Sequence, residues 1–225
     1  MEPPVASRTP GEDRPLRKDA ERNRRRILAA ARELFAAHGL DVTLDDVARH
    51  AGVGVGTVYR RFPGKEDLVE ALFAEEIDLL VARAEQALEE ADPWRSFVDF
   101  LVDGTEHMAC DQGLREVMLS DAYAHDRLGR IRDRLVPLTE AIVHRAQEAG
   151  VLRADFSPTD IPLLHGMIGS VGLLAQSARP EVWRRYLTLV LDGLRPRPGL
   201  TPLPEPALTF AELEQITGIG GEPPR

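Results

Sequence analysis

Apolar residues recur at helical spacing along most of the chain. The first such stretch covers residues 19–38 and ends at Gly39. Its apolar positions are Ile27, Ala31, Leu34 and Phe35. Steps of three and four residues are typical of an amphipathic helix whose apolar stripe faces a core. Alternating or β-branched runs that would indicate strands are nearly absent, so the pattern predicts an all-α protein.

Two short helices are predicted next. Thr43 precedes "LDDVARHA" in N-cap position, with acidic residues in the first turn, and Gly52 ends that helix. The second runs from about residue 54 to Phe62, where Pro63-Gly64 breaks it. Helices this short are unstable alone. We therefore expect both to pack on the helix at 19–38 as a three-helix unit.

Longer helical segments follow from Lys65 to about residue 195. They are predicted at 65–91, from 93 onwards, and at 113–124, 127–149, 158–178 and 180–195. Both ends of the chain are rich in proline and lack a hydrophobic period. We expect a disordered basic arm over residues 1–18 and a Pro-rich tail over 197–225, in which "LTFAELEQIT" can form one or two helical turns.

The charge is unevenly distributed. The formal net charge is −9, yet residues 1–65 carry 13 Lys or Arg against 9 Asp or Glu, whereas residues 66–225 carry 15 against 28. A basic head on an acidic body is typical of a DNA-contacting module joined to one that does not touch DNA, although a solvated charged tail gives the same counts. The single Cys110 excludes an intrachain disulfide, and no apolar run approaches a membrane span. We expect a cytoplasmic protein.

The glycine-rich stretch "GVGVGTVYRRFPGKEDL", residues 52–68, raises the question of a nucleotide-binding loop. A dinucleotide fingerprint follows a strand, and here a helix precedes the glycines. A phosphate loop needs Ser or Thr after Gly-Lys, but Glu66 follows Lys65. A helix-turn-helix fits instead: Ala48 permits close helix crossing, Gly52 makes the turn, and Val58 anchors the second helix.

The stretch "TLDDVARHAGVGVGTVYRRFPGKEDL", together with "RRRILAAARELFAAHGLDVT", resembles the DNA-binding domain of TetR-family transcriptional regulators over about residues 20–70. The resemblance implies a DNA-binding domain at 19–65, with its motif at 43–62, and a helical ligand-binding and dimerisation domain at 66–196. It implies a sequence-specific regulator of transcription, a repressor that a small-molecule effector releases from a palindromic operator. It also implies a homodimer that is not an enzyme and uses no cofactor.

The resemblance assigns roles to individual residues. Thr43 and the start of its helix touch the DNA backbone, while Thr57, Tyr59 and Lys65 contact phosphates. The full predicted DNA-binding set is Arg25, Arg26, Thr43, Val53, Gly54, Val55, Gly56, Thr57, Tyr59, Arg60 and Lys65.

This recognition helix departs from the family pattern. Members usually carry polar residues after "AGV", where this chain has Gly54 and Val55. Few side chains remain for base contacts, so we expect Arg60 to read guanine and the glycines to admit the helix backbone close to DNA. Arg24, Arg25 and Arg26 either reach DNA or form a solvated face.

Within the body, an apolar set with a few polar groups is the candidate effector pocket, with plain core packing as the alternative. It comprises Trp94, Phe97, Leu101, Thr105, Met108, Met118 and Tyr123. A set on the last two long helices is the candidate dimer interface, with intrachain packing as the alternative. It comprises Gly166, Gly169, Ser170, Trp183, Leu187 and Leu191. His107 and Cys110 are too few ligands for a metal site, so none is predicted.

A different class of function is a helical enzyme or ligand-binding protein whose N-terminal unit is only structural. The sequence contains no nucleophile motif or other catalytic constellation that favours it.

Overall fold

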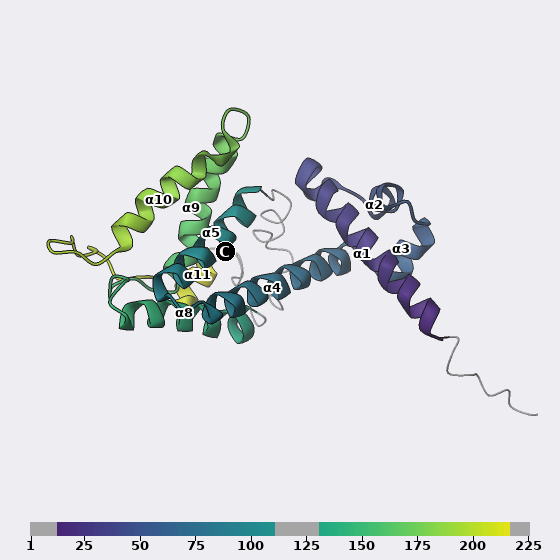
Figure 1. Ribbon diagram of the computed structural model, residues 1–225. Helices are drawn as coiled ribbons and strands as arrows, with labels where there is room; N and C mark the ends of the chain where they lie inside the picture. Colours follow the sequence, from purple (N-terminus) through teal and green to yellow (C-terminus); the bar gives the residue numbers. More distant parts are fainter. Residues whose placement is uncertain (1–12, 111–130, 217–225) are drawn as a thin grey trace, which may run out of the picture.

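The computed structural model describes residues 13–110 and 131–216, and within these ranges the regular structure is helical with no strand (Figure 1). The N-terminal helices are α1 (Asp13–His38), the 3₁₀ turn η1 (Gly39–Asp41), α2 (Leu44–Ala51) and α3 (Val55–Arg61). The later helices are α4 (Lys65–Glu89), α5 (Pro93–Cys110), the π turn η3 (Ile131–Leu135), α8 (Val136–Glu148), α9 (Asp160–Leu174), η4 (Pro180–Val182), α10 (Trp183–Leu194) and α11 (Phe210–Ile216). No helix in the described ranges is long and apolar enough to cross a membrane.

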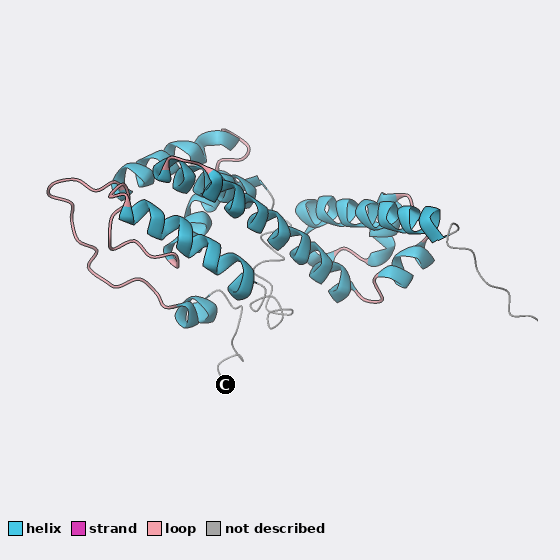
Figure 2. Cartoon of the chain, turned by 60° about the horizontal axis from the view of Figure 1, so that its bottom comes forward, coloured by secondary structure: helices cyan, strands magenta, loops and turns pink. Residues whose placement is uncertain are grey.

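The helices form two groups joined by α4. Figures 1 and 2 show α1, α2 and α3 gathered at one end of α4 and the remaining helices gathered around its other end. Helix α2 packs on α1 and α3 packs on α2, and all three contribute to one core cluster, so the predicted three-helix unit is present. The all-α fold class is therefore confirmed.

Helix boundaries differ from the prediction in several places, of which three are the clearest. Helix α1 begins at Asp13 rather than at residue 19, so the last part of the expected disordered arm is helical. Helix α9 covers 160–174 rather than 158–178. The helix expected at 127–149 begins, where it is described, as a π turn. The helix expected at 113–124 lies outside the described residues.

The hydrophobic core divides inside α4, not at its start. The first cluster joins α1, α2 and α3 to the N-terminal part of α4 and extends along that helix as far as Val81. The second cluster begins on α4 at Ala84 and includes residues of α5, α8 and α9. We call residues 13–81 the head and residues 84–216 the body. The domain boundary expected at residue 65 thus coincides with the start of α4. The boundary between the two core clusters lies about 18 residues later, between Val81 and Ala84.

Helices α5 and α9 make the closest pair in the body. The His165 ring of α9 packs on Gly104 of α5, where a Cβ atom would lie only 2.4 Å from the ring Cε1. Burial lowers the pKa of His165 to about 4, although a hydrogen bond to the Leu101 backbone opposes this effect. His165 is therefore neutral at pH 7, and glycine at position 104 is required by packing.

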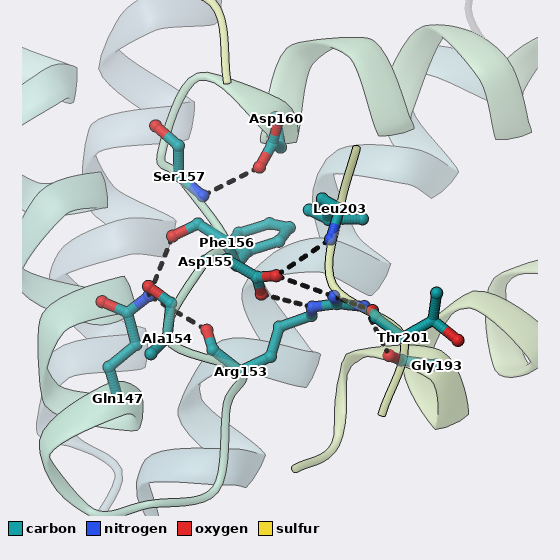
Figure 3. Close-up of polar contacts among 10 residues, drawn as sticks. All are labelled: Gln147, Arg153, Ala154, Asp155, Phe156, Ser157, Asp160, Gly193, Thr201 and Leu203. Atoms are coloured by element: carbon teal, nitrogen blue, oxygen red, sulfur yellow. Dashed lines mark hydrogen bonds and ion pairs between the residues drawn. The ribbon is translucent and has the colours of Figure 1, made fainter. Parts of the chain in front are cut away.

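The C-terminal segment is held against the body by Arg153 (Figure 3). Its buried guanidinium binds Asp155 through Nε at 2.5 Å and Nη2 at 2.9 Å, and it donates to the backbone carbonyl of Thr201 at 2.9 Å. Asp155 also accepts a hydrogen bond from the Leu203 backbone N–H at 3.4 Å. These contacts hold the pKa of Asp155 low, at about 2. The helical turns expected in "LTFAELEQIT" are present as α11.

Candidate DNA-binding site

Helix α2 begins with a capping box. The Thr43 hydroxyl accepts a hydrogen bond from the Asp46 backbone N–H at 3.2 Å and donates one to the Asp46 carboxylate at 2.5 Å. The Thr43 backbone N–H also donates to that carboxylate, at 3.1 Å. These bonds from Thr43 lower the pKa of Asp46. The Thr43 hydroxyl caps the Asp46 backbone N–H, so in the first turn the N–H groups of Leu44 and Asp45, which have no intrahelical acceptor, are left as phosphate donors.

The turn between α2 and α3 has the geometry that the sequence predicted. Ala48 is fully buried where the helices cross, and Gly52 adopts a left-handed conformation with φ of 61°. A residue with a Cβ would be strained at this φ. Val58 is fully buried and anchors α3 on the head core, and Phe62 at the end of α3 is also buried.

Arg26 of α1 holds this turn from outside. Its Nη2 donates to the Ala51 backbone carbonyl at 2.7 Å and to that of Gly52 at 3.3 Å. The guanidinium thus binds carbonyl groups at the C-terminal end of α2, where a positive charge is favourable. Sequence reasoning missed this role because Arg26 and Ala51 are 25 residues apart. The proposed DNA contact of Arg26 stays a prediction.

The other arginines of α1 have different partners. Arg24 Nη1 binds Glu75 Oε1 of α4 at 2.7 Å, so this guanidinium connects two helices of the head. Arg25 is exposed and pairs with Glu21 on the same helix at 3.2 Å. Of these two, Arg25 is the one whose charge faces solvent and can approach DNA.

Helix α3 exposes the face that was predicted to meet DNA. Val55 is 45 % exposed and Tyr59 46 % exposed. Gly54, Gly56 and Arg60 are exposed as well, whereas Thr57 is half-buried. The predicted contact residues Thr57, Tyr59 and Arg60 therefore lie on one short helix whose opposite face is anchored in the core.

Neither Gly54, the N-cap residue of α3, nor Gly56, in its first turn, is required by packing inside the head. A Cβ at Gly56 would meet nothing within 4 Å, and one at Gly54 would meet only the Thr57 hydroxyl at 3.8 Å. Neither has a positive φ. Glycine inside a helix costs about 1 kcal/mol relative to alanine. The packing of the described residues thus gives no reason for a glycine at position 56.

Three further residues complete the surface. Val53 is half-buried and packs against the head core, so only part of it is available to DNA. Lys65 is half-buried as the first residue of α4. The Asp45 carboxylate, which sequence reasoning did not single out, lies beside the Tyr59 hydroxyl and raises its pKa.

Helices α9 and α10 form the second candidate surface. Among the residues expected at a dimer interface, Gly166 and Ser170 are exposed, and a Cβ at Gly166 would meet nothing within 4 Å. Trp183 and Leu187 are instead buried within the chain, where they form a third cluster with Ile168. For these two side chains the structure shows the intrachain packing that was the alternative, and their part in a dimer interface stays a prediction.

The remaining expected interface residues are partly covered too. Gly169 is buried and Leu191 is half-buried. The exposed apolar side chains on these helices are Leu163, Met167, Leu173, Leu174, Tyr186 and Leu189. One side of each helix thus faces the core, and the other exposes these apolar side chains to solvent.

The expected effector pocket is only partly described. Trp94, Phe97 and Leu101 come together in the second cluster, where the ring centroids of Trp94 and Phe97 are 5.8 Å apart. Thr105 is buried and donates to the Leu101 carbonyl at 2.7 Å. Met118 and Tyr123 lie outside the described residues, and the side chain of Met108 is not described. The described members pack as core, so their role in binding a ligand stays a prediction.

The sequence predicts no metal site. No group of three or more His, Cys, Asp or Glu side chains suited to a metal occurs in the described ranges. The side chains of His107 and Cys110 are not described.

A buried small-residue crossing, a left-handed glycine turn and an exposed second helix define a helix-turn-helix DNA-binding protein. Residues 27–72 match the family model for bacterial regulatory proteins of the tetR family, and residues 92–196 match that for the C-terminal domain of SbtR-like transcriptional regulators. The HTH-type transcriptional regulator SrpR of Pseudomonas putida is 30 % identical over 182 residues, which cover 78 % of this chain and 84 % of SrpR. The chain therefore belongs to the TetR family of helix-turn-helix transcriptional regulators.

Solved structures agree with this assignment. The TetR transcription regulatory protein from Mycobacterium vanbaalenii is 33 % identical, with a TM-score of 0.60 over 80 % of this chain and 99 % of that one. SCO0520 from Streptomyces coelicolor is 32 % identical, with a TM-score of 0.59 over 77 % of this chain and 98 % of that one. The fold of FadR from Bacillus subtilis, solved with stearoyl-CoA, is also similar, with a TM-score of 0.59, 20 % identity, and coverage of 76 % of this chain and 99 % of that one. The protein is a DNA-binding transcriptional regulator.

Proposed function

We propose that this regulator is a homodimeric repressor that binds a palindromic operator through α3 and leaves it when a small molecule occupies the body. The observation that carries the DNA part is the exposed face of α3, where a Cβ at Gly56 would meet nothing and Tyr59 is 46 % exposed. A glycine there lets the helix backbone approach the major groove closely. In this arrangement phosphate contacts position the head and Arg60 reads a base.

The dimer is supported by the apolar solvent face of α9 and α10. Exposed side chains such as Met167, Leu174 and Leu189 lie on the same two helices as Gly166, whose open Cβ position permits close helix approach. Burying apolar surface is the main favourable term in association. Two heads on one dimer would reach half-sites about one helical turn, or 34–36 Å, apart.

The effector is proposed from the relatives. FadR was solved with stearoyl-CoA, and SmeT, whose fold is similar at 22 % identity, was solved with triclosan. Both molecules have large apolar parts, and three of the described residues of the expected pocket, Trp94, Phe97 and Leu101, are apolar. By linkage, effector and DNA then weaken each other's binding, with a coupling of about 1–3 kcal/mol. We also propose that the protein works in the cytoplasm and has no enzymatic activity.

The experiment is a footprint and a gel shift with DNA from the region upstream of the gene. The account expects two protected half-sites and an affinity that falls steeply as salt rises from 50 to 200 mM, since phosphate contacts release counterions. A protein that protects no DNA at any salt concentration in this range would contradict the proposal.

A further inference from the structure

Helix α4 belongs to both parts of the molecule. Its first two thirds contribute Phe73, Ile77 and Val81 to the head core, and its last third contributes Ala84 and Ala87 to the body core. A change in the angle between head and body must therefore act on α4 near the point where the two cores meet. The contacts around this point decide how firmly the head is held.

On the head side, two ion pairs lock α1 to α4. Arg24 Nη1 lies 2.7 Å from Glu75 Oε1, and Arg32 Nη2 lies 3.6 Å from Glu76 Oε2. The Glu76 side chain is fully buried, so separating it from Arg32 would leave a desolvated charge with less compensation. Helix α1 and the first half of α4 consequently move as one unit.

On the body side, the π turn η3 contacts α4 within the same helical turn. Arg134 Nη1 lies 2.5 Å from Asp78 Oδ1, and Asp78 is three residues after Glu75. The next residue of η3, Leu135, packs against both the head core and the body core. Figure 1 shows α4 extending from the head into the body, past the start of α8, which follows η3. Arg134 of the body thus contacts α4 in the same helical turn in which Glu75 binds Arg24 of α1.

We propose that Asp78, Arg134 and Leu135 are positioning residues that fix the angle of the DNA-binding head on the body. The proposal rests on the proposed function, in which two heads must meet two half-sites at one separation. Asp78 is about 20 Å along α4 from Lys65, because an α-helix rises 1.5 Å per residue. A tilt of about 10° at Asp78 would displace the start of α4 by about 3.5 Å over that length. A shift of this size exceeds the tolerance of hydrogen bonds to phosphate.

The pair suits a clean test because it is exposed. The side chains of Arg134 and Asp78 are 45 % and 63 % exposed, and exposed pairs contribute little to stability. The variants are Asp78→Asn, Arg134→Gln and the reversed pair Asp78→Arg with Arg134→Asp. The matched control is Asp99→Asn, which breaks an exposed pair with Arg95 inside α5, 3.5 Å apart. Leu135→Ala tests the packing contact separately.

The readout is how well the full-length protein distinguishes operator spacings. The probes are the footprinted operator, versions with the half-sites moved by one or two base pairs, and a duplex with a single half-site. Asp78→Asn and Arg134→Gln should reduce the preference for the native spacing by about two- to fivefold, the effect of an exposed ion pair, with single half-site affinity unchanged. Leu135→Ala should reduce the preference for the native spacing further, and the reversed pair should restore that preference. Asp99→Asn should show the wild-type preference.

Two results would overturn this proposal. One is a spacing preference that stays at the wild-type value in both single variants and in Leu135→Ala. The other is an equal loss of affinity for the single half-site, which would mean that the pair acts on the head itself. A wild-type protein that footprints no DNA would instead overturn the proposed function on which this inference rests.

Discussion

Arg26 of α1 donates a hydrogen bond to the Ala51 backbone carbonyl at 2.7 Å, and so joins the first helix of the head to the end of α2. This contact fixes the turn from which α3 projects. The arginine thus serves the DNA-binding surface from within the fold, whatever else its charge does. Its role can be separated from a direct DNA contact by experiment.

Replacing Arg26 by Gln should lower the free energy of unfolding by about 1 kcal/mol, the net worth of such a hydrogen bond. Thermal unfolding of the full chain measures this. Arg25→Gln is the matched control, since Arg25 is exposed on the same helix and pairs only with its neighbour Glu21 in the described contacts. If Arg26→Gln unfolds at the wild-type temperature and only DNA binding suffers, Arg26 is a DNA contact and not a cap.

Gly56→Ala should have opposite effects on stability and on binding. Alanine is the better helix former by about 1 kcal/mol, and the added Cβ meets nothing in the head. The variant should therefore unfold at a higher temperature while its affinity for operator DNA falls. Calorimetry and gel shifts on one preparation test both effects. A variant that is more stable and binds DNA as well as the wild type would refute close approach at this glycine.

The dimer face should be sensitive to charge. Leu189 on α10 is 58 % exposed, and Leu189→Glu would place a charge in the proposed apolar interface. We expect weaker dimerisation by sedimentation and, as a consequence, weaker operator binding. Ile216→Glu is the control, because Ile216 is 62 % exposed but lies on α11. Equal dimerisation of Leu189→Glu and the wild type would place the interface elsewhere.

Acid should destabilise the body through His165. Burial lowers its pKa to about 4, whereas an unfolded histidine has a pKa of about 6.5. Between these values the unfolded chain binds a proton and the folded chain does not, so stability falls as the pH falls. The loss at pH 5 relative to pH 7 is about 2 kcal/mol by linkage. Urea unfolding at both pH values should show that His165→Gln lacks this part of the pH dependence. Parallel pH profiles for variant and wild type would show that His165 does not titrate as described.

The helix-turn-helix could be predicted from sequence because its determinants are local. Ala48, Gly52 and Val58 lie within eleven residues, and each position demands a particular residue type for a steric reason. The exposed face of α3 followed from that stretch, whereas the regulator class followed from the family resemblance over about residues 20–70.

Long-range packing could not be predicted in the same way. Helix α4 is amphipathic along its length, and nothing in its pattern shows that the head core extends to Val81. Trp183 and Leu187 lie on an apolar face of α10 that suits either a partner or the chain's own third cluster, and the structure shows the latter. The partners of Arg24 and Arg26 depend on contacts across 51 and 25 residues.

The central claim is that α3 and the start of α4 read and hold DNA. Its most direct measurement is the affinity of Tyr59→Phe, Lys65→Ala and Arg60→Ala for the footprinted operator and for a scrambled duplex of equal length. The phosphate-contact variants Tyr59→Phe and Lys65→Ala should lose the same factor on both duplexes, whereas Arg60→Ala should lose affinity for the operator alone, by about 1–3 kcal/mol. Wild-type affinities for all three variants on both duplexes would contradict the account.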